Sequence, residues 1–107
     1  MSRPHREKKI GKMPIYTKFY STNKEALHIT LTLEEYETIR LIDYLGYSQK
    51  ECSESMGIAR SSVVSLYANA RKKLSRFIIE GVALDISGGN YLYNQKEGQR
   101  SMKIAIT

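Results

Sequence analysis

The sequence contains a single cysteine, Cys52, so the chain has no second cysteine for an internal disulfide and no CxxC pair for a zinc site. It also lacks long apolar runs, since none exceeds four residues, which excludes a membrane-spanning segment and the apolar stretch of a secretion signal. We therefore expect a cytoplasmic protein with no membrane partner, whose fold is stabilised by packing alone.

Known catalytic arrangements are missing as well. No nucleophile, base and orienting acid occur in a recognisable arrangement, and no glycine-rich loop precedes an expected helix. His5 and His28 are too isolated to form a zinc site. We expect no enzymatic activity, no cofactor and no bound metal.

Acidic residues are absent from one long stretch of the chain. Residues 57–79 contain five basic residues and no acidic one, and residues 1–18 contain six basic residues and one acidic residue. Residues 32–56, in contrast, contain six acidic residues and two basic ones, within a total of 17 Lys and Arg against 11 Asp and Glu. A solvated helix ordinarily mixes both signs, so this sorting indicates that one end of the chain and one helix face an anionic partner.

A chain of 107 residues is long enough for one domain with a modest core. We divide it into a basic arm with an extended segment at residues 1–30, a helical domain at 31–81, and a short β-hairpin with a tail at 82–107. The first dozen residues lack helical periodicity and are expected to be flexible. Apolar residues alternate at 82–86 and 91–93 around a Gly-Gly-Asn turn, which predicts the hairpin, and they alternate again at 102–106.

Three helices are expected between residues 32 and 80. Thr32 and Glu35 have the spacing of a capping box, in which each side chain bonds a backbone N–H at the start of a helix, and Ser48 and Glu51 repeat it. A third, longer helix of about residues 60–80 begins after Ala59, which offers no capping side chain. Its apolar stripe is formed by Val63, Leu66, Tyr67, Ala70, Leu74, Phe77 and Ile78. The glycines expected to end the three helices are Gly46, Gly57 and Gly81.

The second and third helices have the spacing of a helix-turn-helix. Gly57 is the turn residue and Ser53 is the small residue where the helices cross. The apolar positions expected to form its core are Cys52, Met56, Ile58, Val63 and Leu66. Cys52 is interpreted as one of these core residues and not as a redox group. The plainer alternative is a pair of helices that only pack within a bundle.

Polar and basic residues occupy the outward face expected for the third helix: Arg60, Ser61, Ser62, Ser65, Asn69, Lys72 and Arg76, and Lys73 is a further DNA-binding candidate late on the same helix. In a helix-turn-helix, the first residues of this helix reach base edges in the major groove. Arg60 has the donors to pair with guanine or to hold a phosphate, and Asn69 suits adenine or remains solvated. The serines suit phosphates or waters, whereas the later basic residues would supply affinity and salt dependence. Arg3 and Arg6 of the arm would enter the minor groove or add electrostatic attraction only.

Five short segments between Arg3 and about Tyr91 carry a resemblance to known proteins: "RP" from Arg3, "TLEEYETIRLIDYLGYSQKE" from Thr32, "MGIAR" from Met56, "ARKKL" from Ala70 and "EGVALDISGGNY" from Glu80. They resemble a prokaryotic family of uncharacterised, predicted DNA-binding proteins catalogued as domain of unknown function one hundred thirty-four. The relatives' helix-turn-helix looks like the promoter-reading domain of sigma factors, so the resemblance implies an all-α trihelical core and a role in transcription or DNA binding. Many members carry cysteines in the arm, whereas "HREKKIGK" has none here, which argues against a metal site.

The fold expected from the sequence is mainly α, with a trihelical helix-turn-helix core and short β segments in the flanking N- and C-terminal regions. The function expected is sequence-specific binding of double-stranded DNA by a nucleoid-associated transcriptional regulator. One recognition helix covers only a few base pairs, so a homodimer is expected. The alternative is a protein-interaction module that docks on RNA polymerase or another regulator. RNA binding is less favoured, because the deep groove of an A-form duplex excludes a helix.

Overall fold

The computed structural model describes residues 8–93 of the chain. Its elements, in chain order, are β1 (Lys8–Ile10), β2 (Lys18–Phe19), β3 (His28–Leu31), α1 (Leu33–Thr38), the π-helix η1 (Ile39–Tyr44), α2 (Gln49–Met56), α3 (Arg60–Glu80), β4 (Ala83–Ile86) and β5 (Tyr91–Tyr93). Helices make up about half of the described residues, and short strands precede and follow them in the chain. The expectation of a mainly α chain is therefore confirmed. No helix within residues 8–93 is both long and apolar enough to cross a membrane.

The helix boundaries follow local chemistry that the sequence displays. Both expected capping boxes form: Thr32 and Glu35 exchange side-chain and backbone hydrogen bonds, as do Ser48 and Glu51. The helices α2 and α3 end at Gly57 and Gly81, both in the left-handed conformation with a φ of 69°. At Ala59 no side chain caps the start of α3, as expected.

The segment expected to form one helix from residue 32 to 45 changes its winding at Ile39. The chain passes from α1 into η1, where the N–H of Leu45 bonds the carbonyl oxygen of Arg40, five residues earlier. A π-helical turn holds more residues than an α-helical one, so it rotates the following side chains around the axis. As a result, the side chain of Leu41 is buried beside α2, whereas those of Tyr44 and Leu45 are exposed.

The strands after α3 pair with strands before α1. β4 is the central strand of a three-stranded sheet, antiparallel to β2 and parallel to β3. β5 pairs in parallel with β1, with Ile10 opposite Tyr93. The expected hairpin between residues 82–86 and 91–93 is therefore wrong, because the two strands belong to different sheets. All residues of β4 except Asp85 are buried, and an isolated two-stranded hairpin offers no second layer to bury them.

The expectation of a flexible arm is wrong for residues 8–10. They form β1, and the side chain of Ile10 at its end is fully buried. Arg3 and Arg6 lie outside the described residues, as does the alternating segment at 102–106. β1, β2 and β3 pair with β4 and β5. The two flanking regions that the sequence separated, 1–30 and 82–107, therefore contribute strands to the same sheets.

Two apolar clusters hold α3 along its length. The first lies between the C-terminal half of α3 and the three-stranded sheet and contains Leu31, Leu33, Ala70, Leu84 and Ile86. The second contains Leu41 with all five expected core residues, namely Cys52, Met56, Val63, Ile58 and Leu66. The apolar stripe of α3 ends before Ile78, which is 71% exposed, so that residue was wrongly assigned to the stripe.

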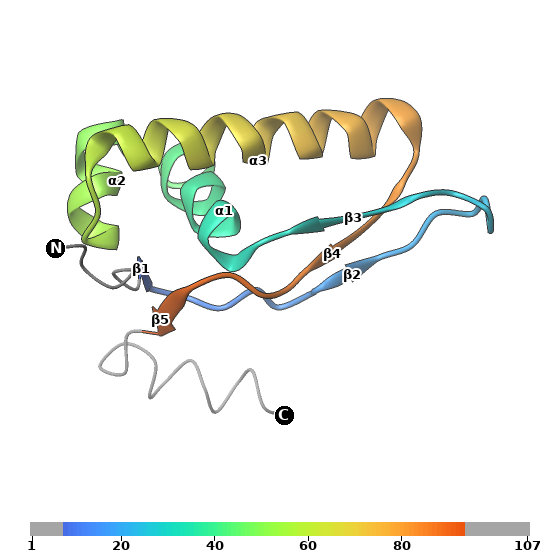
Figure 1. The fold of residues 1–107 in the computed structure, drawn as a ribbon, viewed down its shortest axis with the longest axis horizontal. Helices are drawn as coiled ribbons and strands as arrows, with labels where there is room; N and C mark the ends of the chain where they lie inside the picture. The colour runs from blue at the N-terminus through green and yellow to red at the C-terminus, as the bar shows by residue number, and fades with distance from the viewer. Residues whose placement is uncertain (1–7, 94–107) are drawn as a thin grey trace, which may run out of the picture.

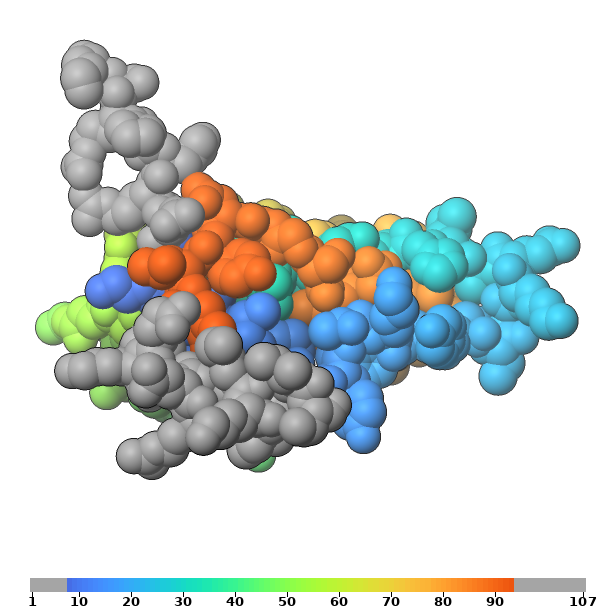
Figure 2. Space-filling view, turned by 90° about the horizontal axis from the view of Figure 1, so that it is seen from below, coloured from blue at the N-terminus to red at the C-terminus, as the bar shows by residue number. Residues whose placement is uncertain are grey.

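The strands and α3 lie on opposite sides of the molecule. α3 extends along one side with α2 at its N-terminal end, and the sheet lies beneath its C-terminal half (Figure 1). From the side opposite α3, the described surface consists mainly of residues that precede α1 and residues that follow α3 in the chain, with α2 visible at one end (Figure 2). The outer face of α3 therefore has no other described element above it.

Candidate nucleic-acid interface

The outer face of α3 presents most of the site residues expected from the sequence. On the inner face of α3, Val63 and Ala70 are fully buried, one in each apolar cluster. A helix places residues three and four apart on the same face, so residues on the other side of α3 face away from the protein. The exposed site residues are Arg60, Ser61, Ser65, Asn69 and Lys72. Ser62 and Arg76 are half-buried.

The positive charges of α3 differ in how far they are neutralised. Arg76 donates to the carboxylate of Glu80 with N–O distances of 3.1 and 2.9 Å. This contact raises the pKa of Arg76 and lowers the pKa of Glu80, because each charge stabilises the other. Arg60 and Lys72 form no ion pair with any residue between 8 and 93. Arg60 is therefore the cation of the outer face without an acidic partner among residues 8–93, whereas the charge of Lys72, after that of Arg76, helps to lower the pKa of Glu80.

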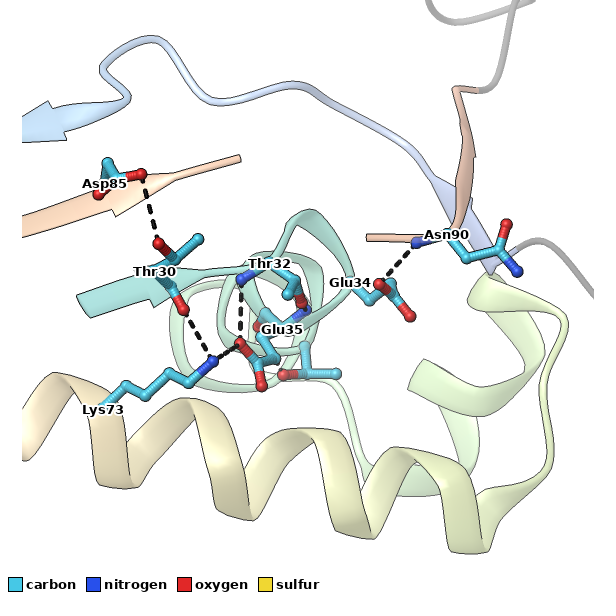
Figure 3. Close-up of polar contacts among 8 residues, drawn as sticks. Thr30, Thr32, Glu34, Glu35, Lys73, Asp85 and Asn90 are labelled. Atoms are coloured by element: carbon cyan, nitrogen blue, oxygen red, sulfur yellow. Dashed lines mark hydrogen bonds and ion pairs between the residues drawn. The ribbon is translucent and has the colours of Figure 1, made fainter. Parts of the chain in front are cut away.

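Lys73 is separated from this exposed set. Its ammonium donates to the carbonyl oxygen of Thr30 and to Oε1 of Glu35, each at 2.7 Å. In Figure 3 its side chain leaves α3 toward the start of α1 and the end of β3. The structure thus places Lys73 as a link between α3, α1 and β3, while Lys72, its neighbour, faces outward.

Asp43 connects η1 to the middle of α3. The hydroxyl of Tyr67 donates to Oδ1 of Asp43 at 2.6 Å, and this hydrogen bond raises the pKa of Tyr67. The guanidinium of Arg71 lies 3.4 Å from the other oxygen of Asp43 and 5.4 Å from the centre of the Tyr67 ring. Tyr67 was expected on the apolar stripe. The residue is half-buried, and its hydroxyl reaches the Asp43–Arg71 ion pair at the surface.

The turn before α3 contacts the N-terminal strand. The side chain of Lys9 crosses Gly57, with its Cε, Cδ and Cγ atoms 3.6, 3.7 and 4.0 Å from where a Cβ of Gly57 would lie. Lys9 is exposed and forms no ion pair with the described residues. Nothing local in the sequence links residues so far apart, so this contact was not predicted.

Three buried glutamates fasten the surrounding segments to α1. Glu34 accepts from the N–H of Asn90 at 2.9 Å, as Figure 3 shows, and pairs with Lys8 at 3.3 Å. Glu37 is fully buried. It accepts two hydrogen bonds of 2.8 Å from Arg40 and one of 2.9 Å from the N–H of Gly11. The third is Glu35, the partner of Lys73. These acids, which the sequence presents only as a charge cluster, set the positions of β1, β5 and α3.

A separate groove lies between the β1–β2 segment and the end of η1. Its volume is about 520 Å³, and no residue of α3 lines it. Ile15, Tyr16 and Tyr44 on its walls are 74%, 73% and 82% exposed, which is unusual for large apolar side chains. The groove is a second candidate surface, with the chemistry of a protein contact.

The described residues offer no evident metal or redox centre. No group of three or more His, Cys, Asp or Glu side chains between residues 8 and 93 is arranged to hold a metal ion. Cys52 is fully buried and its Sγ lies 3.7 Å from the sulfur of Met56. Burial, with a smaller effect from the negative charge of Glu37, raises the pKa of the Cys52 thiol from 9.0 to about 11.

Comparison with known proteins identifies relatives along most of the chain. The family model described as "Protein of unknown function DUF134" matches residues 1–94. A UPF0251 protein of Desulfitobacterium hafniense is 39% identical over 94 residues, which cover 85% of this chain and 75% of that protein. A UPF0251 protein of Ruminiclostridium cellulolyticum is 38% identical over 101 residues, covering 94% and 77%. One of Methanococcus vannielii is 46% identical over 63 residues, covering 59% and 48%. No solved structure matches the chain.

Proposed function

This chain belongs to the family described as "Protein of unknown function DUF134", and we propose that it binds double-stranded DNA in a sequence-specific manner and acts as a transcriptional regulator. The names of its relatives state no activity, so the proposal rests on the geometry of α2 and α3. In this proposal the two helices and the turn at Gly57 form a helix-turn-helix, similar to the promoter-reading domain of sigma factors.

One observation supports this proposal above the others: the outer face of the N-terminal half of α3 is exposed at Arg60, Ser61, Ser65 and Asn69, and its one charged residue, Arg60, is a cation with no ion pair among the described residues. The major groove of B-DNA, about 12 Å wide, admits an α-helix. Helix α3 is held from its inner side by Val63 and Ala70, so it offers a rigid outer face and loses little conformational entropy on binding.

The exposure of each residue suggests its role in the complex. Arg60, at the start of α3, is placed to reach guanine or an adjacent phosphate, and Ser61 and Ser65 to bond bases, phosphates or waters. Asn69 and Lys72 lie further along the helix, where phosphate contact becomes more common than base reading. Lys73 is occupied by Glu35 and is left out of the proposed contacts.

A single α3 would read only a few base pairs, so we propose that two copies bind neighbouring half-sites as a homodimer. Mass measurement at micromolar concentration, with and without duplex, tests this part of the proposal. A single copy on a duplex that contains two selected half-sites would contradict it, without affecting DNA binding itself.

The decisive experiment is duplex binding as a function of salt. The full chain is incubated with a pool of random-sequence duplexes, bound sequences are selected, and their affinity is measured between about 50 and 200 mM salt. We expect a recurring sequence among the selected duplexes and an affinity that falls steeply with salt, because phosphate contacts release counterions. Failure to bind any duplex at low salt would overturn the proposal.

The groove beside η1 favours a second candidate function, a protein-interaction module that docks on RNA polymerase or another regulator. Exposed aromatic and aliphatic side chains such as Tyr16, Tyr44 and Ile15 are typical of the central residues of protein interfaces. This candidate predicts that Tyr44→Ser abolishes binding to a purified polymerase, whereas Arg60→Ala has no effect on it. The opposite pattern on duplex DNA would favour the first candidate.

A further inference from the structure

The strand β1 is held in place by contacts with α1 and with β5. The side chain of Ile10 is fully buried, and the N–H of Gly11 donates to the buried carboxylate of Glu37. Lys8 pairs with Glu34, and the strand as a whole pairs with β5. A residue of β1 therefore keeps a defined position relative to α2 and α3.

Lys8 and Lys9 are adjacent in this strand but have different surroundings. The side chain of Lys8 is 18% exposed and its ammonium lies 3.3 Å from Glu34. Lys9 is exposed, and its aliphatic part lies across Gly57. Packing of the methylene groups on the turn while the ammonium remains solvated is the usual behaviour of a lysine at the edge of an apolar surface.

The position of Lys9 is a consequence of the glycine at the turn. Gly57 has a φ of 69°, a conformation that favours glycine, and it presents no side chain toward β1. Among the Lys9 atoms that approach Gly57, Cε is the nearest, at 3.6 Å from where a Cβ of Gly57 would lie, and the ammonium is bonded to that atom, so the charge lies close to the turn. Arg60, the first residue of α3, follows that turn by three positions.

We propose that Lys9 binds a DNA phosphate and that β1 is therefore part of the DNA interface, an inference that rests on the proposed DNA-binding function. When the start of α3 lies in the major groove, the turn before it faces one of the two phosphate backbones that border the groove. A cation at this turn meets a phosphodiester and not a base edge. Lys9 supplies affinity that is independent of sequence and fixes the depth at which α3 enters.

The test compares two lysines that differ in position but not in charge. Lys24 is exposed in the segment between β2 and β3, which lies at the opposite end of the molecule from α2 (Figure 1). Lys9→Gln and Lys24→Gln remove the same charge, so any effect of net charge alone is common to both. Binding of a selected duplex and of an unrelated duplex is measured over a range of salt concentrations.

For Lys9→Gln we expect both duplexes to bind roughly fivefold more weakly at physiological salt, and the slope of log affinity against log salt to become shallower by about 0.9, because one phosphate contact is lost. Lys24→Gln is expected to keep the wild-type slope, and Lys9→Arg to restore it. Lys9 is exposed, and an unchanged thermal midpoint for Lys9→Gln verifies that the fold is intact.

Three results would overturn the assignment. A wild-type slope for Lys9→Gln would show that Lys9 makes no phosphate contact. An equal change of slope for Lys24→Gln would show that the effect comes from net charge alone. Loss of binding to the selected duplex alone would make Lys9 a base-reading residue. If the unmodified chain bound no duplex at all, both the proposed function and this inference would be wrong. In the three results above, the unmodified chain still binds DNA, so the two kinds of failure are distinguishable.

Discussion

The ammonium of Lys73 lies 2.7 Å from Oε1 of Glu35, and this pair joins the middle of α3 to the first turn of α1. The side chain of Glu35 is only 7% exposed, so its carboxylate depends on this cation for compensation. The same carboxylate also accepts from the N–H of Thr32 in the capping box. One glutamate thus begins α1 and holds α3 against it.

The two adjacent lysines of α3 allow stability and DNA binding to be separated. Lys73→Met removes the cation beside Glu35 and is expected to lower the free energy of unfolding by about 2 kcal/mol. Lys72→Met changes an exposed side chain, so its effect on stability should stay within about 0.5 kcal/mol. Urea unfolding of both variants provides the measurement. Equal losses would contradict the structural role of the Lys73–Glu35 pair.

The base-reading and phosphate-binding residues of α3 should respond differently to mutation. Arg60→Ala is expected to relax preference at one base pair by about 1–3 kcal/mol, if Arg60 pairs with guanine. Lys72→Ala should weaken binding to all duplexes equally, because a phosphate contact carries no sequence information. Affinities for the selected site and for single-base variants of it provide the comparison. Identical profiles for the two variants would contradict this division of roles.

The two glycines before β5 offer a matched test of how Glu34 holds that strand. Gly88 and Gly89 both have positive φ, of 74° and 100°, so alanine at either position adds backbone strain of about 1–2 kcal/mol. A Cβ at Gly88 meets open space, whereas a Cβ at Gly89 would overlap the carboxylate of Glu34 that accepts from Asn90. Gly89→Ala is therefore expected to destabilise the protein more than Gly88→Ala, by urea unfolding.

A double-mutant cycle isolates the cause of that difference. In a Glu34→Ala background the overlap with the carboxylate is absent, so most of the additional cost of Gly89→Ala over Gly88→Ala should disappear. If the additional cost persisted in full, it would arise from the larger φ of Gly89 or from the Cβ of Thr32, which lies 3.2 Å from where a Cβ of Gly89 would be, and not from the carboxylate.

The raised pKa of Cys52 predicts a dependence of stability on alkaline pH. In the unfolded chain the thiol ionises near 9.0, whereas in the folded chain it ionises near 11. As pH rises, the unfolded chain loses this proton first, so its ionisation lowers the free energy of unfolding between pH 9 and about 11, by about 3 kcal/mol in total. The difference between wild type and Cys52→Ala, measured by urea unfolding at each pH, separates this effect from the titration of tyrosines.

Thiol labelling gives an independent check on the same residue. Below pH 9 the buried, protonated Cys52 should react with a thiol reagent only when the protein opens. Labelling in native buffer at the rate seen in urea would contradict the burial of this side chain in the second cluster.

Features that depend on neighbouring residues were predicted from the sequence. The capping boxes at Thr32 and Ser48 and the glycine that ends α2 involve contacts within a few positions, so their spacing is visible in the chain. The second apolar cluster was predicted for a related reason, because the spacing of a helix pair fixes which side chains face one another.

Features that depend on distant partners were not predicted. Alternating apolar residues indicated β4 and β5 but not that they pair with β2, β3 and β1, since alternation specifies a face and not a neighbour. Lys72 and Lys73 are equivalent in sequence, and only the position of Glu35 distinguishes them. The contact of Lys9 with Gly57 was missed because it requires β1 to be fixed first.

The pairing of the first strands with the last ones also determines how the protein emerges from the ribosome. β1 and β2 are synthesised first, yet their partners β5 and β4 are synthesised last. Nascent chains that end before residue 83 can form α2 and α3 but not either sheet. Ile10 of β1 and Phe19 of β2 lack their partner strands until β5 and β4, respectively, have been synthesised, so that is the stage at which chaperones would bind and aggregation would begin.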